Sequence, residues 1–148
     1  IKKIFFFVAI IMLTNCSFEP IFLKKNTNLI ISKLELNGDK KINREIISIL
    51  NINEKDQSEF GYKLILNSNK KLEIISKDKA GNPSIYKITL NVNVSLVKED
   101  ETIKTKRFNL NFTFNNMKNK FDLSQYQKSI ETNLLNKITE EIFIFLNL

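Results

Sequence analysis

The tetrapeptide Leu13-Thr14-Asn15-Cys16 places the only cysteine of the chain in a setting where a thiol can be acylated. Lys2 and Lys3 come first, and an unbroken apolar run from Ile4 to Leu13 leads into the tetrapeptide. A basic start, a short apolar core and a cleavage-site-like tetrapeptide are typical of a bacterial export signal. We therefore predict that residues 1–15 are a lipoprotein signal peptide and that Cys16 carries the lipid.

The other interpretations of this segment are a transmembrane anchor, a buried core helix and an ordinary or uncleaved export signal. A transmembrane anchor fits poorly, because a helix needs roughly twenty apolar residues to cross a hydrocarbon core. An ordinary or uncleaved signal is the stronger alternative, because Asn15 stands where a lipoprotein signal usually has Gly, Ala or Ser. Ser17, and not an aspartate, follows the cysteine, as in lipoproteins that are sorted to the outer membrane. A multiply acylated cysteine would anchor the chain stably.

Composition excludes several kinds of chemistry. The chain has no histidine, which rules out histidine acid–base catalysis and histidine metal sites. One cysteine allows neither an intramolecular disulfide nor a thiolate metal cluster. We also find no phosphate-binding loop and no nucleophile motif. The sequence therefore predicts a protein that is not an enzyme and holds no metal or cofactor.

The charge is strongly positive. The whole chain carries +7, and without Lys2 and Lys3 there are 21 basic against 16 acidic residues, a net charge of +5. Such a surface suits an anionic partner, for example a phosphorylated glycolipid or a membrane surface. The alternative is compositional, because A+T-rich coding alone enriches Lys, Asn, Ile and Phe. A nucleic-acid partner is not expected for an exported protein.

Hydrophobic periodicity predicts the elements that follow. The clearest strand alternates apolar Tyr86 to Leu96 with polar neighbours, and Arg107 to Phe114 reads as its antiparallel partner after a turn at residues 98–101. A long helix is expected from an N-cap at Asp122, with Gln125 in the capping-box position, to near Leu148. Phe108, Phe112 and Phe114 are expected in the core.

The earlier part of the domain is predicted with the same rules. Leu29–Leu36 is a short strand with Ile30, Leu34 and Leu36 on one face, and Lys41–Leu50 is a short amphipathic helix capped by Asp39. Tyr62 to Ile74 fits one long bent strand or two short ones, followed by a turn at residues 77–83.

This element order predicts an α+β fold. We expect a two-layer sandwich in which two helices pack on one face of a mostly antiparallel four-stranded sheet. The expected organisation is a signal peptide over residues 1–15, a lipidated tether over residues 16–27 and a single α+β domain over residues 28–148.

Two passages then resemble a known family. Cys16-Ser17-Phe18-Glu19-Pro20-Ile21-Phe22 is similar to the Cys-Gly-Phe-x-Pro-Leu-Tyr opening of the LPS-assembly lipoprotein LptE family. The passage from Phe112 through Asn115-Asn116 to Ser124, and the order of the elements, resemble that family as well. Ser17 replaces the usual glycine.

The resemblance implies a function and a location. An LptE-like protein would be held by its lipid at the periplasmic side of the outer membrane. It would plug and help assemble the barrel of an LptD-like partner and bind lipopolysaccharide during transport to the outer leaflet. Another outer-membrane lipoprotein adaptor, such as a barrel-assembly or secretin-pilot component, is the alternative.

The resemblance also implies where lipopolysaccharide binds. Lys79-Ala80-Gly81, seven residues before Tyr86, matches a basic position of the family in the turn before a tyrosine-led strand. Lys77 shares that turn, and Lys118 and Lys120 are the candidates for a second basic position, before the last helix. Lysine keeps the charge of arginine but lacks its bidentate fork. The alternative is that these lysines are simply solvated.

Overall fold

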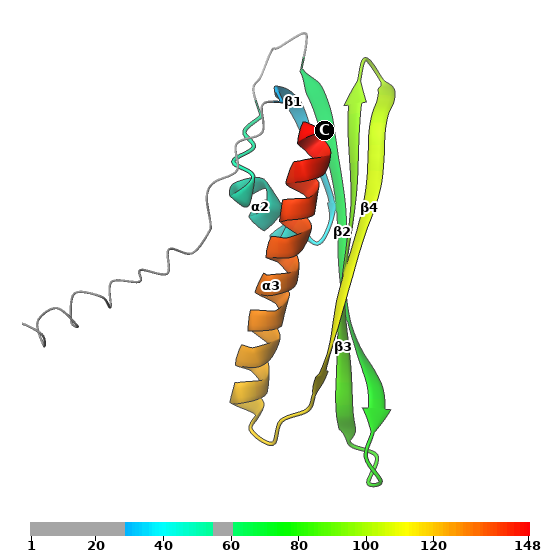
Figure 1. Cartoon of the computed structure of the whole chain (residues 1–148), viewed down its shortest axis with the longest axis vertical. Coiled ribbons are helices and arrows are strands. Elements are labelled where there is room, and N and C mark those ends of the chain that lie inside the picture. The colour runs from blue at the N-terminus through cyan, green and yellow to red at the C-terminus, as the bar shows by residue number, and fades with distance from the viewer. Residues whose placement is uncertain (1–28, 55–60) are drawn as a thin grey trace, which may run out of the picture.

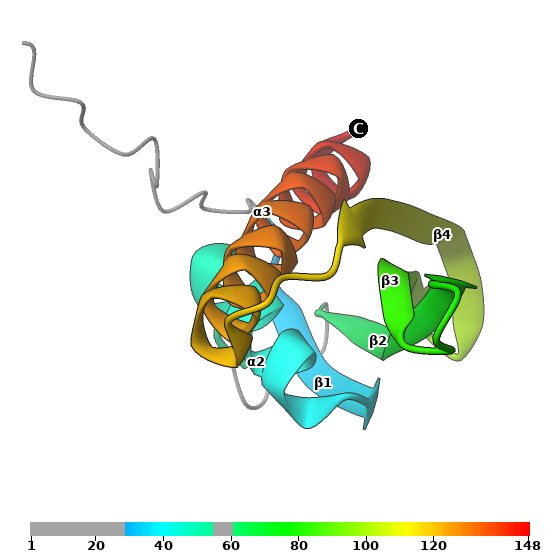
Figure 2. The ribbon, with the colours of Figure 1, turned by 90° about the horizontal axis from the view of Figure 1, so that it is seen from below.

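The computed structural model describes residues 29–54 and 61–148, which form one sheet and two helices (Figure 1). Figure 2 shows both helices on the same side of the sheet. The predicted α+β sandwich is thus confirmed. Cys16, the signal peptide and the tether predicted over residues 16–27 lie outside the described residues. The elements, in chain order, are β1 (Ile31–Gly38), α2 (Lys40–Ile49), β2 (Tyr62–Lys77), β3 (Pro83–Lys98), β4 (Glu101–Asn115) and α3 (Lys120–Asn147).

The four strands follow the order β1-β2-β3-β4 across the sheet. β2, β3 and β4 form an antiparallel meander, whereas β1 lies parallel to β2. A parallel neighbour requires a crossover connection, and α2 lies within that connection. The sheet is therefore mixed, with two of its three pairings antiparallel.

Alternation along β3 defines the two faces of the sheet. Every second residue from Ile88 to Leu96 is buried, whereas the residues between them are half-buried. Because side chains alternate across a strand, one face carries apolar residues throughout and receives the helices. Val92 and Val94 of β3 have no exposed surface, and Ile138 and Ile142 of α3 have none either. The main core lies between these two elements.

β2 is one long strand, which decides between the two possibilities that its sequence left open. It pairs with β3 from Lys63 to Lys77, with register shifts only beyond Ile74. Leu72 and Ile74 keep the helix-facing parity of Leu64, as predicted, yet they are 45% and 49% exposed. The sheet therefore extends beyond the cover that its helices provide.

The register of β1 differs from the prediction. A shift in the β1–β2 pairing between Ile31 and Lys33 changes which residue faces the core. Ile31 is buried, whereas Ile30, which was expected there, is 44% exposed. Strict alternation cannot anticipate such an irregularity, because one extra residue reverses the faces on either side of it.

The junction between β1 and α2 is tightly built. The carboxylate of Asp39 accepts hydrogen bonds from the backbone N–H groups of Lys41 and Ile42, at 3.0 and 3.2 Å, and so caps α2 as predicted. The backbone N–H of Asp39 donates to the carbonyl of Ser68 on β2 at 2.9 Å. Gly38 precedes it with a φ of +82°.

The start of α3 is a second departure from the prediction. The helix begins at Lys120, and its N-cap is Asn119, whose side chain accepts from the backbone N–H of Phe121 at 2.9 Å. Asp122, the predicted cap, lies inside the first turn. Both residues have the chemistry of a cap, and a carboxylate in the first turn is also favoured by the helix dipole. Sequence spacing therefore could not separate them.

The far end of α3 is held by β4. The ammonium group of Lys104 donates to the carbonyl oxygens of Phe145 and Leu146, at 2.7 and 3.3 Å. These carbonyls belong to the last turn of the helix, where a cation is favoured. Neither helix in residues 29–54 and 61–148 combines the length and the hydropathy that a membrane span requires.

The two positive-φ glycines offer a matched test of the β1–α2 junction. A Cβ on Gly38 would lie 2.0 Å from the carbonyl oxygen of Ser68, whereas a Cβ on Gly81, at a φ of +86°, would meet nothing within 4 Å. We expect Gly81→Ala to lower the free energy of unfolding by about 1–2 kcal/mol through backbone strain alone. Gly38→Ala should cost on the order of 1–3 kcal/mol more.

Urea unfolding followed by circular dichroism measures both values. Equal losses for the two variants would contradict the tight approach of β1 to β2 at Gly38.

Candidate functional site

Asp78 organises the turn between β2 and β3. Its carboxylate accepts from the backbone N–H groups of Ala80 and Asn82, both at 2.9 Å, and from the side-chain amide of Asn82 at 3.3 Å. The backbone N–H of Asp78 donates in turn to the carbonyl of Asn82 at 2.8 Å. The turn therefore has a defined shape, and it presents Lys77 and Lys79 as exposed side chains on either side of Asp78.

The electrostatics of the turn follow from this network. The backbone N–H of Asn82 is the main cause that holds the pKa of Asp78 below its ordinary value. The side chain of Asn82 and the backbone N–H groups of Ala80 and Gly81 act in the same direction. Asp78 is therefore ionised at neutral pH, and its charge is already met by N–H donors.

Lys118 lies on the segment between β4 and α3, and Lys120 is the first residue of α3; both are exposed. The segment is tied to the base of the β2–β3 turn by Asn116. Its backbone N–H donates to the carbonyl of Ser84 at 2.8 Å, and its side-chain amide donates to that of Pro83 at 2.7 Å. Figure 1 shows the turn and this segment at the same end of the molecule.

The structure therefore brings the four predicted lysines to one end of the sheet, on two segments that hydrogen bonds connect. We call this end, formed by residues 77–83 and 116–120, the basic end. No ion pair joins any of the four lysines to another described residue. Sequence reasoning placed each pair of lysines in a turn, but it did not place the two turns together.

Apolar side chains lie beside the basic end. Leu72 and Ile74 approach it along β2, and Phe121, in the first turn of α3, is 68% exposed.

Phe108 and Phe114 are buried as predicted, whereas Phe112 is 43% exposed. Phe114 contacts the rings of Tyr86 and Tyr126, with ring centroids 5.6 and 6.0 Å apart.

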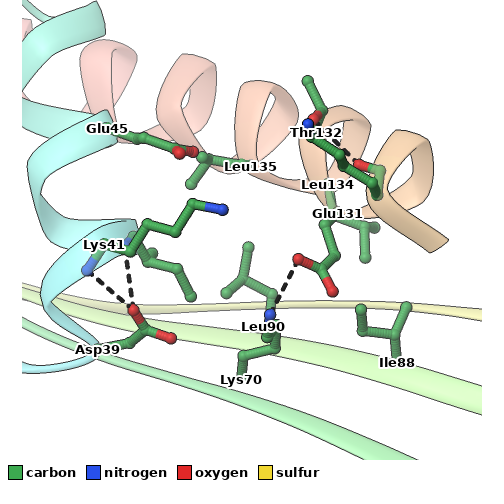
Figure 3. A pocket seen from close by; sticks show the side chains of 12 residues that line it. Asp39, Lys41, Glu45, Lys70, Ile88, Leu90, Glu131, Thr132, Leu134 and Leu135 are labelled. Atoms are coloured by element: carbon green, nitrogen blue, oxygen red, sulfur yellow. Dashed lines mark hydrogen bonds and ion pairs between the residues drawn. The ribbon is translucent and has the colours of Figure 1, made fainter. Parts of the chain in front are cut away.

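A pocket between α2, α3 and the sheet was not foreseen from the sequence (Figure 3). Its walls carry equal numbers of basic and acidic residues above an apolar floor that includes Ile88 and Leu90. Lys70 forms an ion pair with Glu131 at 2.9 Å, and Asp39 is occupied in capping α2. The charges are balanced and partly engaged with one another, which favours a structural role. The lining residues extend from Asp39 to Leu135 along the chain, so no sequence motif signals the pocket.

Within the described ranges, no group of three or more His, Cys, Asp or Glu residues is arranged to hold a metal ion.

Comparison with known proteins gives the context of this fold. No protein-family model matches the chain, and no curated protein matches it by sequence. Solved structures do match. Rare lipoprotein B from Shewanella oneidensis is similar with a TM-score of 0.57 and 12% identity, over 77% of this chain and 92% of that one. The chain has the fold of the lipoprotein B structures.

Two further solved structures have a similar fold. A minor lipoprotein from Acinetobacter baumannii has a TM-score of 0.56 and 11% identity, covering 80% of this chain and 92% of its own. An uncharacterized lipoprotein B from Nitrosomonas europaea has a TM-score of 0.56 and 10% identity, covering 78% of this chain and 81% of its own. These likenesses to lipoprotein structures support the resemblance noted in the sequence at the level of the fold.

The pH dependence of the β2–β3 turn tests the role of Asp78. The unfolded-state pKa of this carboxyl is near 3.8, and the folded-state pKa is lower. The hydrogen bonds of the carboxylate therefore stabilise the turn above pH 3.8, and this contribution is lost as the pH falls through the folded-state pKa. We expect the backbone NMR order parameter of Gly81 to fall in that acidic range. Asp78→Asn keeps a hydrogen-bond acceptor but has no titratable proton, so the order parameter of Gly81 in this variant should not change with pH. An identical pH response in both proteins would contradict this role.

Proposed function

We propose that this chain is an LptE-like lipoprotein of the outer membrane, acylated on Cys16 and facing the periplasm. It would plug and help assemble an LptD-like barrel and bind lipopolysaccharide on its way to the outer leaflet. The proposal includes no catalytic step, no cofactor and no nucleic-acid partner. The observation that carries it is the basic end, where Lys77, Lys79, Lys118 and Lys120 gather on two connected segments of a lipoprotein B fold.

The basic end suits a phosphorylated glycolipid for two reasons. Exposed lysines can make charge-assisted hydrogen bonds to phosphate oxygens. Leu72, Ile74 and Phe121 offer apolar surface close by, which suits the acyl chains of the same molecule. A lipopolysaccharide combines both chemistries, whereas a nucleotide or a sugar phosphate would leave the apolar surface exposed.

The polar face of the sheet supports a barrel partner. The face opposite the helices carries Asn, Ser and Thr side chains that pair across the strands, as in the bonds from Arg107 to Asn93 at 3.0 Å and between Ser95 and Thr105 at 2.8 Å. The interior of a membrane barrel is polar and hydrated. A sheet with a polar open face is suited to such a lumen, and a lipid-facing position would not suit it.

Lipopolysaccharide binding is tested by charge removal at both segments of the basic end. We expect Lys79→Ala and Lys118→Ala each to weaken binding about threefold to tenfold, because each removes a charge-assisted contact. Lys98→Ala, next to the turn at the opposite end of β3, is the matched control and should leave the affinity unchanged. Titration of the purified chain with lipopolysaccharide gives the values. An unchanged affinity in Lys79→Ala would remove that residue from the site.

The barrel partner is tested by purification from solubilised outer membrane. A tagged chain should bring down one large β-barrel protein in defined proportion, and depletion of the chain should leave that barrel misassembled. Identification of a barrel-assembly or secretin subunit as the partner would favour the alternative adaptor function. Normal assembly of the barrel without the chain would contradict the proposal.

A further inference from the structure

β4 is an edge strand, and half of it has none of the usual protection against pairing. No described element pairs with its outer side (Figure 1). Its first half carries Lys104, Lys106 and Arg107, and charged side chains on an edge oppose pairing with another strand. From Phe108 to Asn115 there is no charged residue at all. We call Phe108–Asn115 the open half of β4.

The other free edge differs. β1 ends at Gly38, opposite Ser68, so the outer side of β2 is unpaired beyond that point. That stretch contains Lys70, Lys71, Glu73 and Lys77, and Lys70 lies on the helix-facing side. It therefore has the inward-pointing charge that discourages strand addition. On β1, the edge strand at that side of the sheet, the backbone N–H of Leu34 already donates to the side chain of Glu54 at 3.4 Å. The open half of β4 contains no charged residue.

A groove runs beside this open half. Leu110 and Phe112 of β4 form one wall, and Tyr126, Ile130 and Asn133 of α3 form the other. The groove encloses about 730 Å³, its open mouth included. Phe112 and Tyr126 are 43% and 39% exposed, so the apolar surface is accessible. Lys137 of α3 places a positive charge at one end.

We propose that the open half of β4 accepts an extended segment of a partner polypeptide as a fifth strand. Its alternate side chains would be apolar and would enter the groove between β4 and α3. The proposal is independent of glycolipid binding, because the groove and the strand edge contain none of the four lysines of the basic end.

Backbone chemistry identifies the occupant as a polypeptide. The outer N–H and C=O groups of β4 alternate along the strand with the spacing that another strand matches, at a distance of about 4.8 Å. Side chains on such a strand alternate, so every second one would face the groove. Strand addition of this kind combines main-chain hydrogen bonds for affinity with pockets for specificity.

Charge favours a partner over a second copy of this chain. Pairing β4 with β4 would bring two sets of Lys104, Lys106 and Arg107, and two copies of Lys137, to one seam. Only Glu101 of each copy would oppose them on the strands. Like charges held close together disfavour association. We therefore expect the partner segment to carry an acidic residue where it meets Lys137 or Arg107.

A designed peptide tests the inference directly. The probe is a fluorescent nonapeptide of alternating Val and Thr with Asp at both ends, titrated with the purified full chain and followed by anisotropy. Its control has the same sequence with alternate backbone nitrogens methylated, which removes hydrogen-bond donors and keeps the side chains. We expect saturable binding of the probe, at least about tenfold weaker binding of the methylated control, and slowed amide exchange within residues 108–115.

Variants of the chain locate the site. Phe112→Lys introduces an inward-pointing charge at a half-exposed position and should weaken binding about tenfold or more. Ser129→Phe, at an exposed position of α3, should do the same by filling the groove. Ile103→Lys, on an exposed residue in the first half of β4, is the matched control and should change the affinity less than about twofold.

Three results would overturn the inference. One is the absence of saturable binding, and another is equal affinity for the methylated peptide, which would indicate an apolar pocket without strand addition. The third is concentration-dependent self-association of the chain with protection of residues 108–115, which would make a second copy the occupant.

Discussion

The ladder between β3 and its two neighbours is the constraint on which the other elements depend. β3 pairs with β2 on one side and β4 on the other over nearly all of its length. Its alternate residues from Ile88 to Leu96 are buried, so the register of the ladder determines which side of all three strands faces the helices. A slip by one residue would turn the apolar set outward. Helix packing and strand pairing therefore reinforce one arrangement.

The basic residues in the described part of the chain differ in their surroundings. Lys104 holds the last turn of α3, and Lys70 and Lys63 form ion pairs with Glu131 and Glu35. Pairs of this kind at a surface contribute at most about 1 kcal/mol each to folding. The lysines of the basic end have no such partner among the described residues. Part of the positive charge is therefore engaged within the fold, whereas the four lysines of the basic end remain exposed.

The regular parts of the fold could be predicted from the sequence because each depends on local periodicity. Alternation along β3 and β4 and the apolar spacing of α3 gave the strands, the long helix and the layer arrangement. The N-cap of α3 was misplaced because Asn119 and Asp122 have equivalent capping chemistry three residues apart. The predicted orientation of Ile30 was wrong because the register shift in β1 breaks the alternation on which the prediction rested.

The site was predictable only in pieces. Lys79 and Lys118 could each be assigned to a turn, but their common location depends on the bonds of Asn116 to Ser84 and Pro83. The groove beside β4 combines residues of a strand and a helix whose individual side chains look ordinary in sequence. Such features arise from the packing of distant segments, and a single sequence contains no periodic signal for them.

The length of β3 has an electrostatic consequence. The described chain begins beside Tyr62, at the end of the sheet opposite residues 77–83. Sixteen residues of strand separate the two ends by about 50 Å. At physiological ionic strength, fields between exposed charges decay over about 8 Å. The ends are several screening lengths apart, so the four lysines of the basic end and the residues at the start of β1 act on their surroundings independently. The two ends are connected mechanically, by the sheet and by α3, which runs along it (Figure 1).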